Sequence, residues 1–181
     1  IEEYVHGSPL NSILDEGRIV DEKTAIGYMM QLVQALKALH GQKPPIIHRD
    51  IKPSNIMITS EGVLKLIDFN AAKIYVDNVI EDTVTLGTKS YAAPEQFGYK
   101  KVDTRTDIYL LGATIYHLTT GQVYEPGNMK KYRGKLKPIL ATCLESDPDR
   151  RYEDVWKIEK DLIKLQRKSA PKMIVAVALI V

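Results

Sequence analysis

The stretch His48-Arg49-Asp50-Ile51-Lys52-Pro53-Ser54-Asn55 places a carboxylate, two cations and an amide within one short segment. Thirteen residues after Asn55 the chain reads Asp68-Phe69-Asn70, and Ala93-Pro94-Glu95 follows further on. Phosphoryl transfer depends mainly on positioning and charge neutralisation, for which a carboxylate, an ammonium group and an amide suffice. The residue types and their spacing therefore point to phosphoryl transfer.

Composition limits the other function classes. A chain of 181 residues with 44% hydrophobic content is long enough for one domain with its own core. The net charge of +2 gives no indication of a nucleic-acid partner. The single cysteine, Cys143, excludes an internal disulfide and favours a reducing compartment, and its apolar neighbours indicate a core residue.

Hydrophobic periodicity predicts most of the helices. Apolar residues recur at helical spacing over 24–40, and the segment 107–119 is apolar nearly all round, which predicts a helix inside the domain. Residues 138–145 and 152–167 are expected to form two further helices. Ser8-Pro9 resembles the start of a short helix, with a hydroxyl cap and Pro at the first position.

Two short β-prone runs, 56–58 and 63–67, are separated by Ser60-Glu61-Gly62, which predicts a hairpin. Residues 70–92 show no period and are expected to form a long loop. The fold class predicted from these patterns is mainly α with a small β hairpin element.

The order and spacing of the motifs resemble the catalytic half of a serine/threonine protein kinase of the bacterial receptor-like kind. The resemblance implies the C-terminal lobe of the protein-kinase fold, which is α+β overall in an intact domain. It covers about residues 1–168. We expect residues 1–7 to be the linker between the two lobes, 8–168 the C-terminal lobe and 169–181 a juxtamembrane stretch.

The resemblance also implies roles for individual residues, with ATP and Mg²⁺ as cofactors. Asp50 would accept the proton of the substrate hydroxyl, and Lys52 would neutralise the transferring γ-phosphate. Asn55 and Asp68 would bind Mg²⁺. The backbone groups of two residues before the first helix would bind adenine; these are Glu3 and Val5.

The segment Asp68-Phe69-Asn70 departs from the Asp-Phe-Gly of the family because Asn stands in the place of Gly. Asn is the residue that tolerates positive φ best after Gly. We therefore expect the backbone turn to survive with less freedom to flip, and the active site to be modified but working.

The loop that follows carries three further expectations from the resemblance. Arg49 would pair with a phosphate on Thr83 or Thr85, which would order the loop. Thr88 would dock the substrate backbone and contact the catalytic Asp and Lys. The substrate is expected to be a protein with a Ser or Thr acceptor, because Lys52 is typical of Ser/Thr kinases.

Other matches are structural. Glu95 and Arg150 are expected to form a buried ion pair that braces the lower part of the lobe. Asp107 would hydrogen-bond back to the loop at His48-Arg49, and His48 itself is interpreted as a packed, hydrogen-bonded core histidine. The other three histidines, His6, His40 and His117, are isolated in the sequence and receive no role.

Several alternatives stay open. A pseudokinase that binds nucleotide or partners without transfer is favoured by Asn70, and a phosphotransferase acting on a small molecule is disfavoured by Lys52. The family's glycine-rich loop, strand lysine and partner glutamate do not occur in the chain. We therefore expect the chain to need its own N-terminal lobe as a partner and to be inactive or nearly so by itself. An exposed lobe interface would favour dimerisation.

The run from Met173 to Val181 is entirely apolar and follows a basic stretch that contains Lys164, Arg167 and Lys172. Nine residues are too few to cross a bilayer, but a basic flank is typical of the cytoplasmic side of a membrane span. The sequence therefore predicts a cytoplasmic domain anchored by a single-pass helix that begins near Met173.

Overall fold

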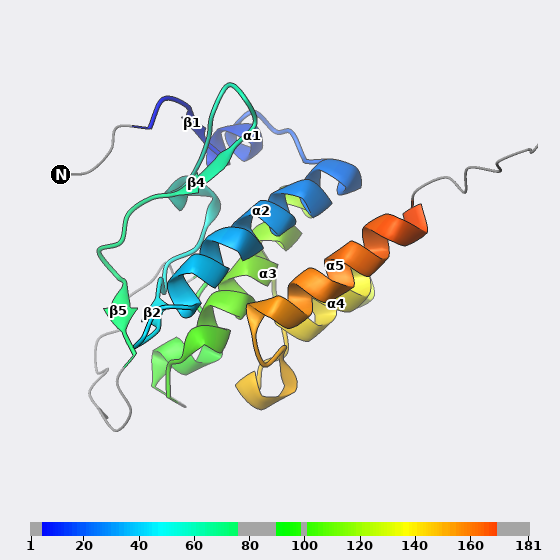
Figure 1. Ribbon diagram of the computed structural model, residues 1–181. Helices are drawn as coiled ribbons and strands as arrows, with labels where there is room; N and C mark the ends of the chain where they lie inside the picture. Colours follow the sequence, from blue (N-terminus) through cyan, green and yellow to red (C-terminus); the bar gives the residue numbers. More distant parts are fainter. Residues whose placement is uncertain (1–4, 76–89, 99–100, 170–181) are drawn as a thin grey trace, which may run out of the picture.

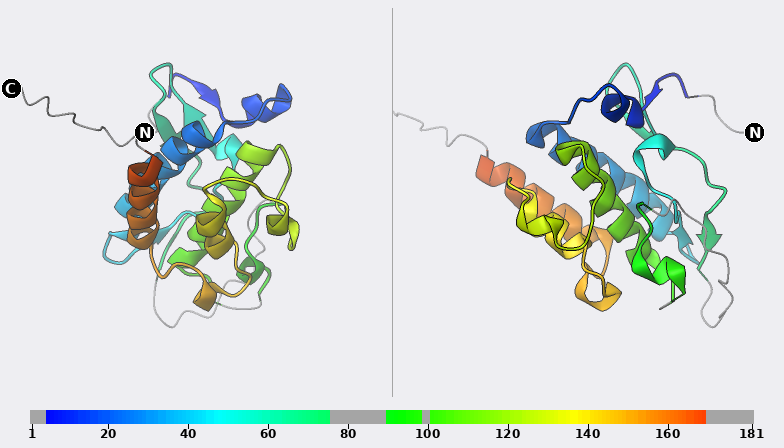
Figure 2. Two further views of the ribbon diagram at one scale, coloured as in Figure 1. Left: turned by 90° about the vertical axis from the view of Figure 1, so that its right-hand side faces the viewer. Right: turned by 180° about the vertical axis from the view of Figure 1, so that it is seen from behind.

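The computed structural model of the chain describes residues 5–75, 90–98 and 101–169 (Figure 1). Two long helices form its centre: α2 (Glu22–His40) and α3 (Thr104–Thr120). The helices α4 (Lys137–Cys143) and α5 (Val155–Ser169) pack beside them, α4 on α3 and α5 on α2 (Figures 1 and 2). The short strands lie on the side of the molecule away from α5.

The two central helices begin at aspartate caps. The Asp21 side chain accepts hydrogen bonds from the backbone N–H of Lys23 (2.9 Å) and Thr24 (3.1 Å), and Asp103 accepts one from Arg105 (2.8 Å). An N-cap carboxylate satisfies N–H groups that have no partner within the helix. Nearly every side chain of α3 from position 106 to 118 is buried, so the prediction of an interior helix is confirmed.

The predicted hairpin is present as β3 (Ile56–Ile58) and β4 (Leu64–Leu66), which pair antiparallel with Ile56 opposite Leu66. Gln31 of α2 holds this hairpin against the helix: its amide nitrogen donates to the Gly62 carbonyl (3.1 Å), and its amide oxygen accepts from Leu64 N–H (2.9 Å). A second small sheet pairs β2 (Ile46–Ile47) with β5 (Lys73–Ile74), and β5 lies inside the region predicted as loop.

The prediction of a helix start at Ser8-Pro9 is wrong. These two residues form strand β1, which pairs antiparallel with β3 in the order β1-β3-β4. Helix α1 (Asn11–Asp15) begins after them. Pro is tolerated on an edge strand because its missing N–H then removes no central ladder bond, and the next residue, Leu10, still donates to the Ile56 carbonyl (2.8 Å).

Short 3-10 turns connect these elements. In the described ranges these turns are η1 (Pro53–Asn55), η2 (Pro94–Phe97), η3 (Asn128–Lys130) and η4 (Pro148–Arg150). Three of them begin at Pro, whose fixed φ suits a first helical position. The turn η1 contains Asn55 of the first motif, and η2 contains Pro94 and Glu95 of the Ala93-Pro94-Glu95 motif.

Close packing between α3 and α4 depends on Gly112. A Cβ added at this glycine would lie 2.8 Å from Cβ of Cys143 and 3.2 Å from Cγ of Leu144. Cys143 is fully buried at this contact, and burial raises the pKa of its thiol. The prediction that Cys143 is a core residue is therefore confirmed.

No helix within the described ranges is long and apolar enough to cross a membrane. The predicted anchor near Met173 lies outside the described residues, because the description ends at residue 169.

Candidate active site

The loop from His48 to Lys52 follows strand β2. Its backbone is hydrogen-bonded to Asp107, in the first turn of α3. One carboxylate oxygen of Asp107 accepts from the His48 N–H (2.8 Å) and the other from the Arg49 N–H (2.8 Å). Arg49 adopts a positive φ of 71°. The contact between Asp107 and the loop, which the resemblance implies, is present, and it fixes the backbone immediately before Asp50.

His40 is a third partner of the Asp107 carboxylate and was not predicted from the sequence. Its Nε2 lies 2.9 Å from Asp107 Oδ2, and both side chains are buried. His40 is the last residue of α2, so the contact joins the end of α2, the start of α3 and the loop at one buried point. The residues are 67 positions apart in the chain, so no local pattern could reveal the contact.

The loop brings Asp50, Lys52 and Asn55 together. Lys52 Nζ lies 2.7 Å from Asp50 Oδ2, and the Asn55 amide nitrogen donates to the same oxygen at 2.8 Å. The same nitrogen also donates to the Asp50 backbone carbonyl at 2.9 Å. Asp50 and Lys52 are partly exposed, whereas Asn55 is buried in η1. The three residues form one hydrogen-bonded unit, of which Asp50 and Lys52 stay partly exposed.

Gln96 connects this loop to the Ala93-Pro94-Glu95 segment. Its amide nitrogen donates to the Arg49 carbonyl (2.9 Å), and its amide oxygen accepts from the Ala93 N–H (2.9 Å). From the other side, the Thr114 hydroxyl of α3 donates to the Ile51 carbonyl (3.2 Å). Gln96 and Thr114 are positioning residues that sequence reasoning missed, since neither belongs to a motif.

Asp68 follows strand β4 and lies close to the turn that carries Asn55, because Ile67 N–H donates to the Asn55 carbonyl (3.0 Å). The Asp68 side chain is exposed, and its carboxylate accepts from Asn70 N–H (3.2 Å). Mg²⁺ prefers oxygen ligands and is usually bound by one or two side chains together with substrate phosphates. An amide oxygen and a carboxylate on adjoining segments fit such an ion.

The backbone of this segment differs from the expectation for Asn70. Among the described residues, the non-glycine residues with positive φ are Arg49 and Asp68, the latter at 62°. Asn70 does not need the left-handed conformation that favours glycine. Replacing Gly by Asn at this position therefore introduces no backbone strain in this conformation.

The buried ion pair involves Arg151, so the prediction of Arg150 is wrong. Arg151 Nη1 lies 2.6 Å from Glu95 Oε1, and its Nη2 lies 2.8 Å from Glu95 Oε2. Arg150 ends the turn η4, is exposed, and approaches Glu145 at 3.7 Å. The turn directs the first of the two neighbouring arginines to solvent and the second to the interior.

Arg151 and Glu95 are fully satisfied in the interior. The other guanidinium donors of Arg151 reach three backbone carbonyls, those of Glu145 (2.7 Å), Arg105 (3.0 Å) and Ser146 (3.2 Å). Glu95 also accepts from the Thr106 hydroxyl (2.8 Å). A buried charge pair is tolerated only with such complete pairing.

His48 is packed as predicted, but its ring is not hydrogen-bonded within the described part of the chain. The ring is fully buried and lies 4.9 Å from the Phe69 ring, centroid to centroid. Its contribution to hydrogen bonding comes from its backbone N–H, which binds Asp107. The side chain therefore joins the loop to the Asp68-Phe69-Asn70 segment by packing.

Several predicted site residues lie outside the described residues. These are Glu3, Thr83, Thr85 and Thr88. Val5 is described and half-buried, and the side chain of Arg49, within the loop, is buried. The expectations for adenine contact, loop phosphorylation and substrate docking therefore stay predictions.

Tyr91, just before Ala93-Pro94-Glu95, contacts α3. Its hydroxyl lies 2.5 Å from Nδ1 of His117. Burial raises the pKa of Tyr91 to about 12 and lowers the pKa of His117 below its usual value. Both side chains are therefore neutral near pH 7, and the contact is a hydrogen bond between neutral groups.

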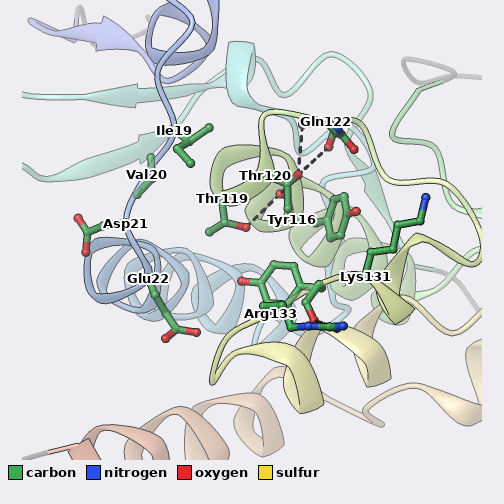
Figure 3. Close-up of a pocket in the computed structure, with 11 residues that line it drawn as sticks. Ile19, Val20, Asp21, Glu22, Tyr116, Thr119, Thr120, Gln122, Lys131 and Arg133 are labelled. Atoms are coloured by element: carbon green, nitrogen blue, oxygen red, sulfur yellow. Dashed lines mark hydrogen bonds between the residues drawn. The ribbon is translucent and has the colours of Figure 1, made fainter.

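A cavity of about 410 Å³ lies on another part of the surface (Figure 3). Its walls come from the segment leading into α2, the end of α3 and residues 131–133, and they include Glu22, Tyr116 and Lys131. None of the residues in the hydrogen-bonded unit around Asp50 lines it. The cavity is thus separate from the candidate active site.

Comparison with known proteins shows which family the chain resembles. Residues 1–172 match the protein kinase domain family. The chain is 33% identical to a probable serine/threonine-protein kinase of Clostridium perfringens over 91% of its own length and 27% of the relative. It is 30% identical to the serine/threonine-protein kinase PknB of Mycolicibacterium smegmatis over 93% of its length and 30% of the relative. The chain therefore spans less than a third of these relatives.

Proposed function

The chain belongs to the protein kinase family, and we propose that the intact protein transfers the γ-phosphate of ATP to serine or threonine hydroxyls of proteins. In this proposal residues 1–7 are the linker between lobes and residues 8–168 form the C-terminal catalytic lobe. The observation that carries it is the hydrogen-bonded unit of Asp50, Lys52 and Asn55.

The roles of these residues follow from their chemistry. The Asp50 carboxylate accepts the proton of the substrate hydroxyl and orients the hydroxyl oxygen. Lys52, whose Nζ lies 2.7 Å from Asp50 Oδ2, holds positive charge beside the transferring phosphoryl group. Asn55 orients the Asp50 carboxylate through one hydrogen bond and holds the Asp50 backbone carbonyl through a second. Bound Mg²⁺, held by the oxygens of Asn55 and Asp68, would neutralise charge on the ATP phosphates.

Protein substrates and the rest of the nucleotide clamp belong to the same proposal. The chain's serine/threonine kinase relatives and Lys52 support Ser or Thr as the acceptor. The missing phosphate-binding loop and strand lysine would come from an N-terminal lobe, without which the chain would be inactive or nearly so. Phosphorylation of Thr83 or Thr85 would place an anion for Arg49, and Thr88 would position the substrate. A membrane helix near Met173 would anchor the protein.

The test uses the intact protein in its full reading frame. We would incubate it with Mg-ATP, map phosphorylated residues by mass spectrometry and compare the Asp50→Asn variant. Asp15→Asn makes the same chemical change at an exposed helix position and serves as the control. We expect phosphate on Ser or Thr in the parent and in the control, and a loss of at least 100-fold in the Asp50 variant. Equal transfer by both variants would remove Asp50 from the reaction.

A second reading is a pseudokinase, which is favoured by Asn70 in the place of the family's glycine. Binding of Mg-ATP by the folded protein without transfer to itself or to generic protein substrates would support this reading. The Asn70→Gly variant separates the two. A gain of transfer in this variant would show that Asn70 suppresses the reaction, whereas unchanged high activity would leave the kinase proposal in place.

A further inference from the structure

The outer side of α5 carries a narrow stripe of four residues: Trp156, Lys160, Ile163 and Arg167. Their spacing of four, three and four residues places them on one face of an α-helix. The opposite face, with Ile158 and Leu162, is fully buried against the rest of the lobe. The stripe therefore points away from the molecule, and α5 lies at its edge (Figures 1 and 2).

Both apolar members of this α5 outer stripe are exposed. Trp156 is 39% exposed and Ile163 is 36% exposed, although most large apolar side chains of the described residues are buried. An exposed Trp and Ile that alternate with two cations at helical spacing make an amphipathic surface. Such a surface is typical of helices that lie in a membrane interface.

The cations of the stripe have no acidic partner among the described residues. The nearby acids are already paired: Glu159 binds Lys37 of α2 (2.9 Å), and Asp161 binds Lys164 (2.9 Å). Glu153 similarly pairs with Lys157. Lys160 and Arg167 are exposed and form no ion pair within the described residues, so their charge is available to an anionic partner.

We propose that the α5 outer stripe binds the surface of an anionic lipid bilayer. Trp and Ile would enter the headgroup boundary, and Lys160 and Arg167 would contact lipid phosphates while their alkyl stems cover apolar surface. The sequence beyond α5 favours lipid over a soluble partner, because Lys168 and Lys172 continue the positive charge up to the apolar run that starts at Met173.

Trp156 makes a direct test practical, because it is the only tryptophan of the chain. We would titrate the full 181-residue chain with vesicles of phosphatidylcholine, and with vesicles that also contain phosphatidylserine, at low and high salt. With the anionic vesicles we expect a blue shift of the tryptophan emission and quenching by brominated lipid. Salt should weaken both, since exposed charges are screened.

Charge variants separate the stripe from general electrostatics. Each basic residue near an anionic surface changes partitioning roughly fivefold, so Lys160→Gln with Arg167→Gln should weaken binding about 25-fold. The control, Lys130→Gln with Lys131→Gln, removes the same charge from the end of η3 and the residue that follows it, outside α5. It should leave the quenching of Trp156 by brominated lipid in place.

Four outcomes would overturn the proposal. Vesicle binding with unchanged Trp156 emission would assign attachment to another segment, and quenching that is equal on neutral vesicles would remove the role of anionic lipid. Equal weakening by both double variants would reduce the effect to net charge. A blue-shifted emission without vesicles, together with a dimer in sedimentation, would show that a second copy of the chain covers the stripe.

Discussion

Replacing Arg151 with Met is expected to lower the free energy of unfolding by about 3–5 kcal/mol. The change leaves the Glu95 carboxylate, which is only 2% exposed, with the Thr106 hydroxyl as its remaining side-chain partner among the described residues. It also removes the donors that reach three backbone carbonyls. A buried charge without its counterion is one of the few mechanisms by which a single substitution destabilises a protein strongly.

The neighbouring position supplies a matched control. Arg150→Met removes the same charge and adds the same side chain, but the Arg150 side chain is 71% exposed and lies 3.7 Å from Glu145. Exposed pairs of this kind contribute about 0–1 kcal/mol. The two variants should therefore differ by several-fold in effect, although they are adjacent in the chain.

Urea unfolding followed by circular dichroism measures both. With a denaturant slope of about 2 kcal/mol per molar, the Arg151 variant should shift the midpoint by roughly 1.5–2.5 M and the Arg150 variant by less than about 0.5 M. Adding Glu95→Gln to Arg151→Met should restore part of the loss, because no buried charge then remains. An equal or larger effect of Arg150→Met would refute the reasoning and would indicate that Arg150, and not Arg151, pairs with Glu95.

Two further predictions concern packing and titration. Gly112→Ala should destabilise the lobe by about 1–3 kcal/mol, because its Cβ would meet Cys143, whereas Gly27→Ala in α2 meets nothing within 4 Å and should stabilise by about 0.5–1 kcal/mol. Similar urea midpoints for the two variants would contradict this. Burial lowers the pKa of His117 in the folded state, so the unfolded chain binds a proton first as pH falls below about 6.5. Stability should therefore fall between pH 7.5 and 5.5, with a smaller fall in His117→Asn; equal slopes in the two proteins would argue against it.

Local patterns predicted the elements whose stability is itself local or strongly periodic. The helix over 24–40 and the hairpin around Gly62 follow from apolar spacing and turn residues, and both are present. Ser8-Pro9 shows the limit of this reasoning, because a helix-start signal was overridden by pairing with β3. Pairing partners far along the chain leave no mark on the local sequence.

Site residues could be predicted only where a motif contains them. Asp50, Lys52 and Asn55 belong to one contiguous loop and come together within hydrogen-bonding distance. Gln96 contacts the loop from 47 positions away, and His40 binds the loop's anchor Asp107, which lies 67 positions further along the chain. Neither His40 nor Gln96 lies in a motif. The choice between two adjacent arginines for Glu95 likewise depended on the geometry of a turn, which residue order alone does not fix.

The conformation of the candidate active-site loop is determined by the lobe itself. The positive φ of Arg49 is unfavourable for a non-glycine residue by about 1–2 kcal/mol and persists only if its surroundings hold it. Three hydrogen bonds do so: Asp107 accepts the N–H groups of His48 and Arg49, and Gln96 binds the Arg49 carbonyl. Both partners lie in described elements that follow the loop in the chain, Asp107 in α3 and Gln96 in η2. Because the proposed base is thus oriented before any ligand binds, a nucleotide would need to bring only its phosphates and metal ion to Asp50, and not to reorganise the loop.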